Sequence, residues 1–216
     1  MTRQWPVPAG LILLAAVPVI AGAARVTQLS SGAEITADNA RFFASPVPVV
    51  AHIVGATVFC VLGALQFVPG LRRHAWHRRS GRLVLPAGLI AALSALWMTA
   101  FYPKPPHDEL LTAFRYVFGV AMAACLVLGF LAVRRRDFDR HRAWMMRGYA
   151  IGLGAGTQVF TLGPLMVLSD DPYGLPRALL HVLAWVLNLA VAEWFIRREP
   201  ASSRAGGQLK VAEVAS

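Results

Sequence analysis

The chain is short of charged residues and of cysteine, and both shortages narrow the class of protein. Only 15% of its 216 residues are charged, whereas soluble domains carry roughly 25%. A soluble globular domain is therefore disfavoured. The two cysteines, Cys60 and Cys125, both lie within apolar stretches. They indicate no disulfide framework, and we expect them to pack as small apolar residues.

Several motifs that carry chemistry are also missing from the sequence. It contains no Walker loop, no HExxH zinc motif and no GxSxG nucleophile elbow. Gly152, Gly154 and Gly156 are spaced as in a nucleotide-binding loop, but no strand precedes them, so this function is not indicated. The alternating polarity of a transmembrane β-barrel is absent too, for example from the run GLIAALSALWMTAF.

Long apolar blocks are what the sequence does contain, and they predict an all-α fold. Hydrophobic residues make up 56% of the chain, and its mean hydropathy is +0.54. A helix needs about 20 mostly apolar residues to cross a bilayer. The fifth block is long, which predicts a tilt or a bend near Pro164. Six blocks predict a bundle of six transmembrane helices: 7–24, 47–68, 83–101, 114–133, 143–168 and 176–196.

The two ends of the chain differ in character. Residues 199–216 are small and polar, and they predict a disordered cytoplasmic tail after a single transmembrane domain over residues 1–198. The first block resembles a secretory signal with small residues at a cleavage site, Ala21 to Ala23. Its full length and its prolines, Pro8 and Pro18, favour a helix that is retained.

The positive charge is distributed unevenly between the predicted loops. Five of the 21 basic residues lie with most of the acidic ones on one predicted side of the membrane, and the other sixteen lie on the side that carries both termini. Both termini are therefore predicted to be cytoplasmic. The net charge of +10 is then expected to face anionic lipid headgroups instead of nucleic acid. Sixteen of the 21 lysines and arginines fall on one side: Arg3, Arg72, Arg73, Arg78, Arg79, Arg82, Arg134, Arg135, Arg136, Arg140, Arg142, Arg147, Arg197, Arg198, Arg204 and Lys210.

Two histidines inside the predicted helices suggest a cofactor. Ionisable side chains within spans are costly and usually face the bundle interior. His52 and His181 each lie about five residues inside the outer end of their helices, so their depths match. Such a pair could ligate the iron of haem b, and Arg115 could hold a haem propionate. The alternatives are that both histidines pack between helices, relay protons or contact a substrate.

On the predicted cytoplasmic side, a second group of residues is a candidate site. His77 and His141 could form a second cofactor plane, or they could belong to a basic collar facing lipid headgroups. Arg147 and Glu193 have similar predicted depths in the fifth and sixth spans, so we expect an ion pair if these helices are neighbours. Asp137 and Asp139 are the alternative partners of Arg147.

The glycines of the fifth block repeat every fourth residue at Gly148, Gly152 and Gly156. Small residues at this spacing let transmembrane helices approach closely. The sequence leaves open whether that approach is to other helices of the same chain, or to a second copy or another membrane protein.

Three stretches resemble a known family: AHIVGATVFCVLGALQFVPGLR, HAWHRRSGR and HRAWMMRGYA. They are similar to bacterial predicted membrane proteins grouped as domain of unknown function 2306, over about His52 to Glu193. The resemblance implies a multi-helix protein of the bacterial inner membrane and no established reaction. The placing of histidines near both helix ends is also similar to cytochrome b561-type and haem A synthase-type bundles, whose specific motifs are missing here. The matching positions are His52, Gln66, His77, Arg78, Gly81, Arg82, His141, Arg142, Trp144, Met145 and Arg147.

Three functions from different classes follow from these patterns. The first is a haem-binding or redox-linked membrane protein, with an unidentified membrane redox partner. The second is a small-molecule or ion carrier whose internal polar path includes His52, Gln158, Asn188 and Arg147. The third is a non-catalytic partner or assembly subunit, in which glycine faces bind another protein or a second copy. The sequence indicates no reaction, and it shows no inverted repeat or clearly broken helix pair that would favour the carrier.

Overall fold

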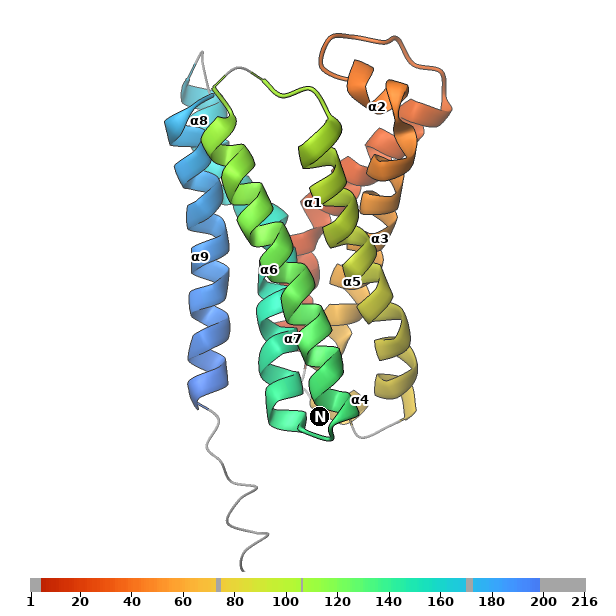
Figure 1. Cartoon of the computed structure of the whole chain (residues 1–216), viewed down its shortest axis with the longest axis vertical. Coiled ribbons are helices and arrows are strands. Elements are labelled where there is room, and N and C mark those ends of the chain that lie inside the picture. Colours follow the sequence, from red (N-terminus) through yellow and green to blue (C-terminus); the bar gives the residue numbers. More distant parts are fainter. Residues whose placement is uncertain (1–4, 73–74, 106, 170–172, 199–216) are drawn as a thin grey trace, which may run out of the picture.

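Long helices with roughly aligned axes make up most of the protein, and successive ones run in opposite directions (Figure 1). The computed structural model describes residues 5–72, 75–105, 107–169 and 173–198. Within these ranges there is no strand, so the all-α prediction is confirmed. The helices are α1 (Pro6–Ser30), α2 (Ala40–Ala44), α3 (Pro46–Leu65), α4 (Pro69–Arg72), α5 (Ala75–Phe101), α6 (Glu109–Arg134), α7 (Phe138–Gly152), α8 (Gly154–Leu168) and α9 (Leu175–Arg198).

Six segments of the described chain are long and apolar enough to cross a membrane. They are α1, α3, α5, α6, the combined α7 and α8 (Phe138–Leu168) and α9. Each coincides with one predicted block, which confirms the prediction of six spans. Many large apolar side chains on these helices are exposed, including Leu13, Phe101 and Val167. In a membrane this surface contacts lipid tails, which are as apolar as the side chains themselves.

Five predicted boundaries differ from the structure by three residues or more, including the end of α1 at Ser30 instead of residue 24 and the start of α6 at Glu109 instead of residue 114. Helix α3 ends at Leu65 instead of residue 68, because residues 66–68 form a turn before Pro69. The helical conformation is unfavourable for a residue that precedes proline. Helices α5 and α7 begin well before the predicted spans, at Ala75 and Phe138. His77 and His141 therefore lie in the first turns of these two helices.

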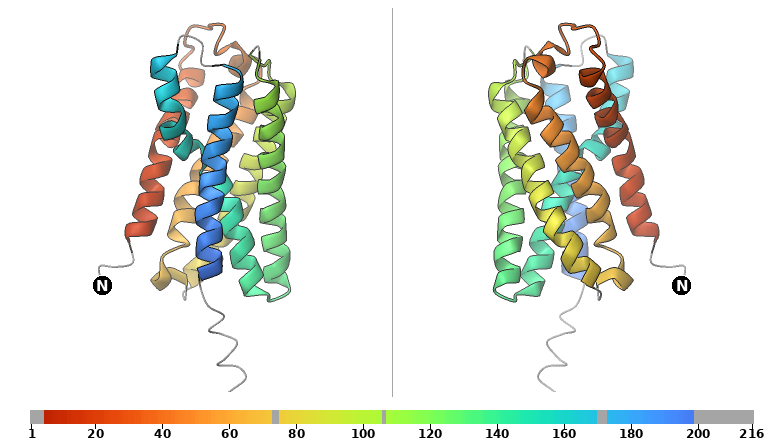
Figure 2. Two further views of the ribbon diagram at one scale, coloured as in Figure 1. Left: turned by 90° about the vertical axis from the view of Figure 1, so that its left-hand side faces the viewer. Right: turned by 90° about the vertical axis from the view of Figure 1, so that its right-hand side faces the viewer.

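The bundle has two distinct ends. Helix α4, the start of α1 and the finish of α9 lie at one end, called here the α4 end, and α2 lies at the other, the α2 end (Figures 1 and 2). The helix ends and connections at the α4 end carry most of the described arginines, among them Arg135 and Arg136 between α6 and α7. The α4 end is thus the one that the distribution of positive charge predicts to be cytoplasmic.

The fifth span is interrupted in its middle, at Leu153, and not near Pro164 as the sequence suggested. Leu153 leaves the helix that ends at Gly152, and a new helix starts at Gly154 and continues through Pro164 to Leu168. The first turn of the new helix contains a hydrogen bond between residues three apart, from Gly156 N to Leu153 O (2.9 Å). Closely spaced glycines weaken a helix, and the break falls between two of them, Gly152 and Gly154.

The break gives the two halves of the span different neighbours. Helix α7 packs against α6, α9 and α3, whereas α8 packs against α9 and α1. Figure 2 shows α7 beside α6 at the α4 end and α8 beside α1 at the α2 end. Because α8 turns away from α6, the interior between α3, α5 and α6 at the α2 end is left without a central helix.

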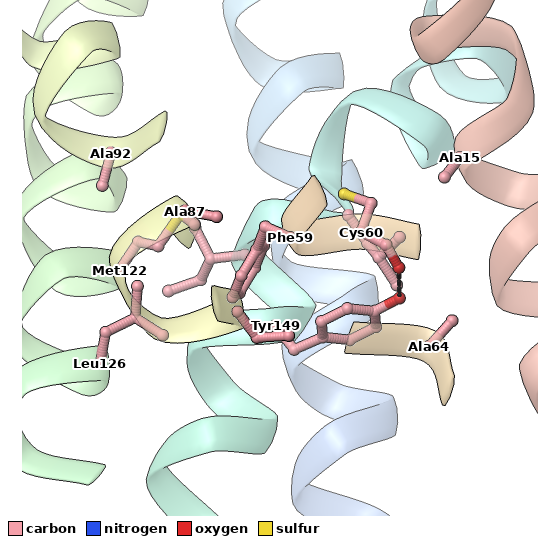
Figure 3. Close-up of a cluster of buried hydrophobic side chains, with 12 residues drawn as sticks. Ala15, Phe59, Cys60, Ala64, Ala87, Ala92, Met122, Leu126 and Tyr149 are labelled. Carbon is pink, nitrogen blue, oxygen red and sulfur yellow. Dashed lines mark hydrogen bonds between the residues drawn. The ribbon is translucent and has the colours of Figure 1, made fainter. Parts of the chain in front are cut away.

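The core lies around Phe59, at the level of the break (Figure 3). The Phe59 side chain is 1% exposed, and its ring lies between two glycines, Gly88 of α5 and Gly152 of α7. A Cβ atom at either glycine would come within 2.7 Å of the ring. Tyr149 packs beside Phe59, with ring centroids 5.5 Å apart, and its hydroxyl donates to the Cys60 carbonyl oxygen at 2.7 Å.

The glycine repeat of the fifth span serves contacts within the chain. A Cβ at Gly148 would meet Leu126 of α6, one at Gly152 would meet Phe59 of α3, and one at Gly156 would meet the backbone carbonyl of Leu14 in α1. The expected close approach of helices is therefore present inside the bundle. This repeat gives no support to an assembly role, because its face is already covered.

Replacing Gly156 with valine is expected to lower stability by about 1–3 kcal/mol, because a side chain there meets the rigid backbone of α1 and forces α8 away from it. Gly163 is the matched control, since it lies on the same helix and a Cβ there meets nothing within 4 Å. Thermal unfolding of both variants in detergent measures the difference. Equal loss for Gly156→Val and Gly163→Val would show that helix propensity, and not the α1–α8 contact, is responsible.

Candidate functional sites in two interior cavities

The first cavity lies at the α2 end and has a volume of about 430 Å³. It extends from the connection at residues 103–105 down to Phe59, between α1, α3, α5, α6 and α8. His52 and Arg115, two of the predicted cofactor residues, both line it, together with the basic residues Arg41 and Lys104. Most of the remaining wall is apolar, so the cavity combines cationic groups with an apolar interior.

The connections at this end are held in place by local hydrogen bonds. Asn39 is buried, and its side chain accepts from Thr36 N (2.7 Å) and donates to Glu34 O (3.0 Å). The Tyr102 hydroxyl donates to the Ser45 carbonyl at 2.6 Å, and desolvation by burial raises the pKa of this hydroxyl. These bonds fix the segment that carries Arg41 over the mouth of the cavity.

The second cavity lies at the α4 end and has a volume of about 500 Å³. His77 of α5 and His141 of α7 line it together, as do three arginines from the same two helices: Arg78, Arg82 and Arg142. Its apolar wall includes aromatic and sulfur-containing side chains, which are Phe59, Phe67, Phe130, Met145, Met146 and Tyr149. The residues that the sequence placed in a second cofactor plane thus share one cavity.

Phe59 borders both cavities and separates them. Its ring is held between Gly88 and Gly152, and Tyr149 covers it toward the α4 end. Phe67 also packs on Tyr149, with ring centroids 5.2 Å apart. The bundle therefore contains two largely apolar spaces, each with some basic side chains in its wall, and an aromatic layer between them.

Three histidines have the same ring arrangement. The Nδ1 atom of His52 lies 2.9 Å from Ala91 O, that of His141 lies 2.8 Å from Gly129 O, and that of His181 lies 2.8 Å from Arg177 O. A carbonyl oxygen can only accept, so Nδ1 carries the proton and Nε2 keeps a lone pair in each neutral ring. Histidines that ligate metals commonly have this second hydrogen bond, which fixes the ring and its tautomer.

His181 is placed differently from the sequence prediction. It is buried on α9, and its ring lies beside Trp185, with centroids 6.2 Å apart. Trp185 lines the α2-end cavity, but His181 is not among the described residues that line either cavity. The α2-end cavity therefore holds one histidine of the predicted pair, and shared ligation by His52 and His181 stays a prediction.

The predicted ion pair between Arg147 and Glu193 is confirmed. Two hydrogen bonds join the side chains, from Nε to Oε1 at 2.5 Å and from Nη2 to Oε2 at 3.2 Å. The Trp144 ring lies under the same guanidinium, 4.9 Å from it. The pair joins α7 to α9. Asp137, one of the alternative partners of Arg147, contacts Arg140 instead, at 3.3 Å.

The polar path of the carrier hypothesis is not continuous. His52 and Gln158 line the α2-end cavity, but Asn188 joins α9 to the broken span, where it bonds Thr157 Oγ1 (2.8 Å) and Ala150 O (3.1 Å). Arg147 is bonded to Glu193 and lines neither cavity in the described chain. Two of the four residues therefore hold helices together.

Several cavity residues were missed by the sequence interpretation. The sequence places three of them in loops or at helix ends, namely Arg41, Lys104 and Thr112. The folded connections bring these residues to the cavity. Tyr149 could have been found, because it lies two turns after Arg142 on the same face of α7 and lines the α4-end cavity with it. Among the described residues no group of three or more His, Cys, Asp or Glu side chains could hold a metal ion.

The fold and its cavities define a multi-pass α-helical membrane protein. The family model described as predicted membrane protein (DUF2306) matches residues 49–196, and the chain belongs to this family. The match includes every residue of the α4-end cavity. Comparisons with curated proteins and with solved structures find no match.

Proposed function

We propose that the protein binds haem b within the membrane, in the α4-end cavity, where His77 and His141 would hold its iron. The observation that carries the proposal is that two histidines from different helices line one largely apolar cavity. Helix bundles commonly build cofactor sites from side chains on facing helices. The α2-end cavity offers one histidine, so it supports the proposal less.

The residues around the α4-end cavity suit the chemistry of a haem group. A volume of about 500 Å³ is within the usual range of cofactor sites. Phe67, Phe130 and Met145 supply an apolar wall for the macrocycle, while Arg78 and Arg82 can donate charge-assisted hydrogen bonds to its propionates. Both arginines are exposed at the start of α5, where the propionates would reach the headgroup region.

His141 is prepared for ligation by its neighbour α6. Its Nδ1–H donates to Gly129 O, and Gly129 has no side chain, so Met145 of α7 packs directly against it. The hydrogen bond to Gly129 O fixes the His141 imidazole before a ligand binds, which reduces the conformational entropy lost on binding. If bound, haem would supply one-electron redox chemistry, and the imidazoles of His77 and His141 would hold its iron.

The location in the cell is part of the same proposal. The arginine-rich α4 end would face the cytoplasm and its anionic headgroups, with the protein in the bacterial inner membrane. The haem would then lie near the cytoplasmic surface, within reach of a membrane redox partner or of a second copy of the chain.

Absorption spectroscopy of the purified protein tests haem binding. After expression with added haem and purification in a non-ionic detergent, the full chain is expected to show a Soret band. Reduction by dithionite should sharpen the visible bands, and extraction should give about one b-type haem per chain. A protein that stays colourless when supplied with excess haem, while remaining monodisperse, would rule the proposal out.

A further inference from the structure

The described residues that line the α2-end cavity include three cations and no carboxylate. Arg41, Lys104 and Arg115 line it, and within the described residues none of them has a carboxylate within ion-pair distance. The nearby acid, Asp108, is 1% exposed and pairs instead with Arg177 at 3.3 Å. Lys104 is exposed, but Arg41 and Arg115 are half-buried, and a cation partly removed from water is costly without a partner. An anionic ligand would supply that partner.

Three residues that line the same cavity each have a buried polar atom with no hydrogen-bond partner in the described structure. These atoms are Arg41 Nε, Thr112 Oγ1 and Gln158 Nε2. Thr112 is only 8% exposed, and buried polar groups in folded proteins are nearly always paired. The atoms come from α2, α6 and α8, three separate elements around one space. These three atoms are covered in this structure, so an anion held by Arg115 would accept from them once their side chains rotate toward it.

The rest of the wall is apolar and continues inward to Phe59. Ile53, Met98, Phe118, Met122 and Ile151 contribute to it. A small hydrated anion gains nothing from such a wall, whereas an alkyl chain buries apolar surface on it at about 25 cal/mol per Å². The polar atoms and the charge therefore specify the head of a ligand, and the wall specifies its tail.

We propose that the α2-end cavity binds an anionic amphiphile, with a carboxylate or phosphate-ester head held by Arg115, Arg41, Thr112 and Gln158 and an apolar chain directed toward Phe59. The space exists because α8 leaves α6 after Leu153 and packs on α1 (Figure 2). The assignment is independent of haem binding at the α4 end, because Phe59 is the only described residue that lines both cavities.

Titration of the delipidated full chain in a non-ionic detergent tests the proposal. The probes are dodecanoate, dodecyl phosphate, dodecanol, dodecyltrimethylammonium and inorganic phosphate, with binding followed by calorimetry and native mass spectrometry. We expect both anionic amphiphiles to bind at one site, at least tenfold more tightly than dodecanol, the cationic amphiphile or phosphate. The ratio of dodecanoate to dodecyl phosphate affinity identifies which head is preferred. Equal binding of dodecanol, or binding of phosphate as tight as that of dodecyl phosphate, would overturn the proposal.

Variants locate the site. Arg115→Gln should weaken the anionic probes about tenfold or more, since a charge-assisted hydrogen bond is lost. Thr112→Val, which keeps the shape, should weaken them severalfold, whereas Arg115→Lys should retain most of the affinity. Arg25→Gln is the matched control, because Arg25 lies at the same end but does not line the cavity. Unchanged binding by folded Arg115→Gln and Thr112→Val proteins, or equal weakening by Arg25→Gln, would place the ligand elsewhere.

Discussion

Replacing His141 with alanine is expected to abolish haem binding or to weaken it by more than 100-fold. Loss of a partner that only orients a metal ligand already costs about 10–100-fold in affinity, and His141 is proposed as a ligand itself. His77→Ala should have the same effect, because both imidazoles line the α4-end cavity. Absorption spectra of the purified variants, supplied with equal haem, measure the loss of the Soret band.

His52→Ala is the matched control for these variants. His52 has the same Nδ1 hydrogen bond to a helix carbonyl as His141, but it lines the other cavity. The spectrum of His52→Ala should therefore equal that of the unchanged protein. Added imidazole should restore the band in His141→Gly, which a purely structural role of His141 would not allow. Loss of the band in His52→Ala and His181→Ala, with His141→Ala unaffected, would instead support haem at the α2 end.

Replacing Arg147 with methionine is expected to destabilise the bundle by about 1–3 kcal/mol, the usual loss for hydrogen bonds to a charged group that leave the partner unpaired. Glu193 would keep its charge between α7 and α9, and its remaining ion-pair partner in the described chain would be Arg197, at 3.7 Å. Removing both charges in Arg147→Met/Glu193→Met should recover much of the loss, since replacing a whole ion pair is often nearly neutral. Unfolding by heat or by a denaturing detergent measures both effects.

The exposed pair at the start of α7 provides the comparison. Arg140 contacts Asp137 at 3.3 Å, but its side chain is 77% exposed, against 28% for Arg147. Arg140→Ala should change stability by less than about 0.5 kcal/mol, because exposed ion pairs contribute little. A loss of the same size for Arg140→Ala and Arg147→Met would show that the Arg147–Glu193 pair has no special structural role.

The spans could be predicted from the sequence because membrane crossing depends on local hydrophobicity and length, which need no knowledge of neighbours. The Arg147–Glu193 pair followed from matched depth on consecutive spans. The break at Leu153 did not, since the sequence shows a proline at residue 164 that suggested a later bend. Which of Gly152, Gly154 and Pro164 interrupts the helix is decided by packing: Gly152 contacts Phe59, Gly154 contacts Trp185 and Gly156 contacts α1.

The candidate sites were only partly predictable for the same reason. Depth along a helix can be counted from a sequence, but rotation about its axis relative to other helices cannot. His52 and His181 match in depth, yet only His52 lines the α2-end cavity. The sequence places His77 and His141 at the membrane interface. They share a cavity because α5 and α7 begin earlier than predicted. Arg41 and Lys104 reach the α2-end cavity through folded connections that carry no helical pattern.

The position of the iron tests the central proposal most directly. Crystals of the haem-loaded protein, measured at the iron absorption edge, would give an anomalous difference map. We predict one iron peak in the α4-end cavity, between the imidazoles of His77 and His141, at a ligand distance from both. A peak beside His52 in the α2-end cavity, or an iron bound by neither His77 nor His141, would contradict the proposal.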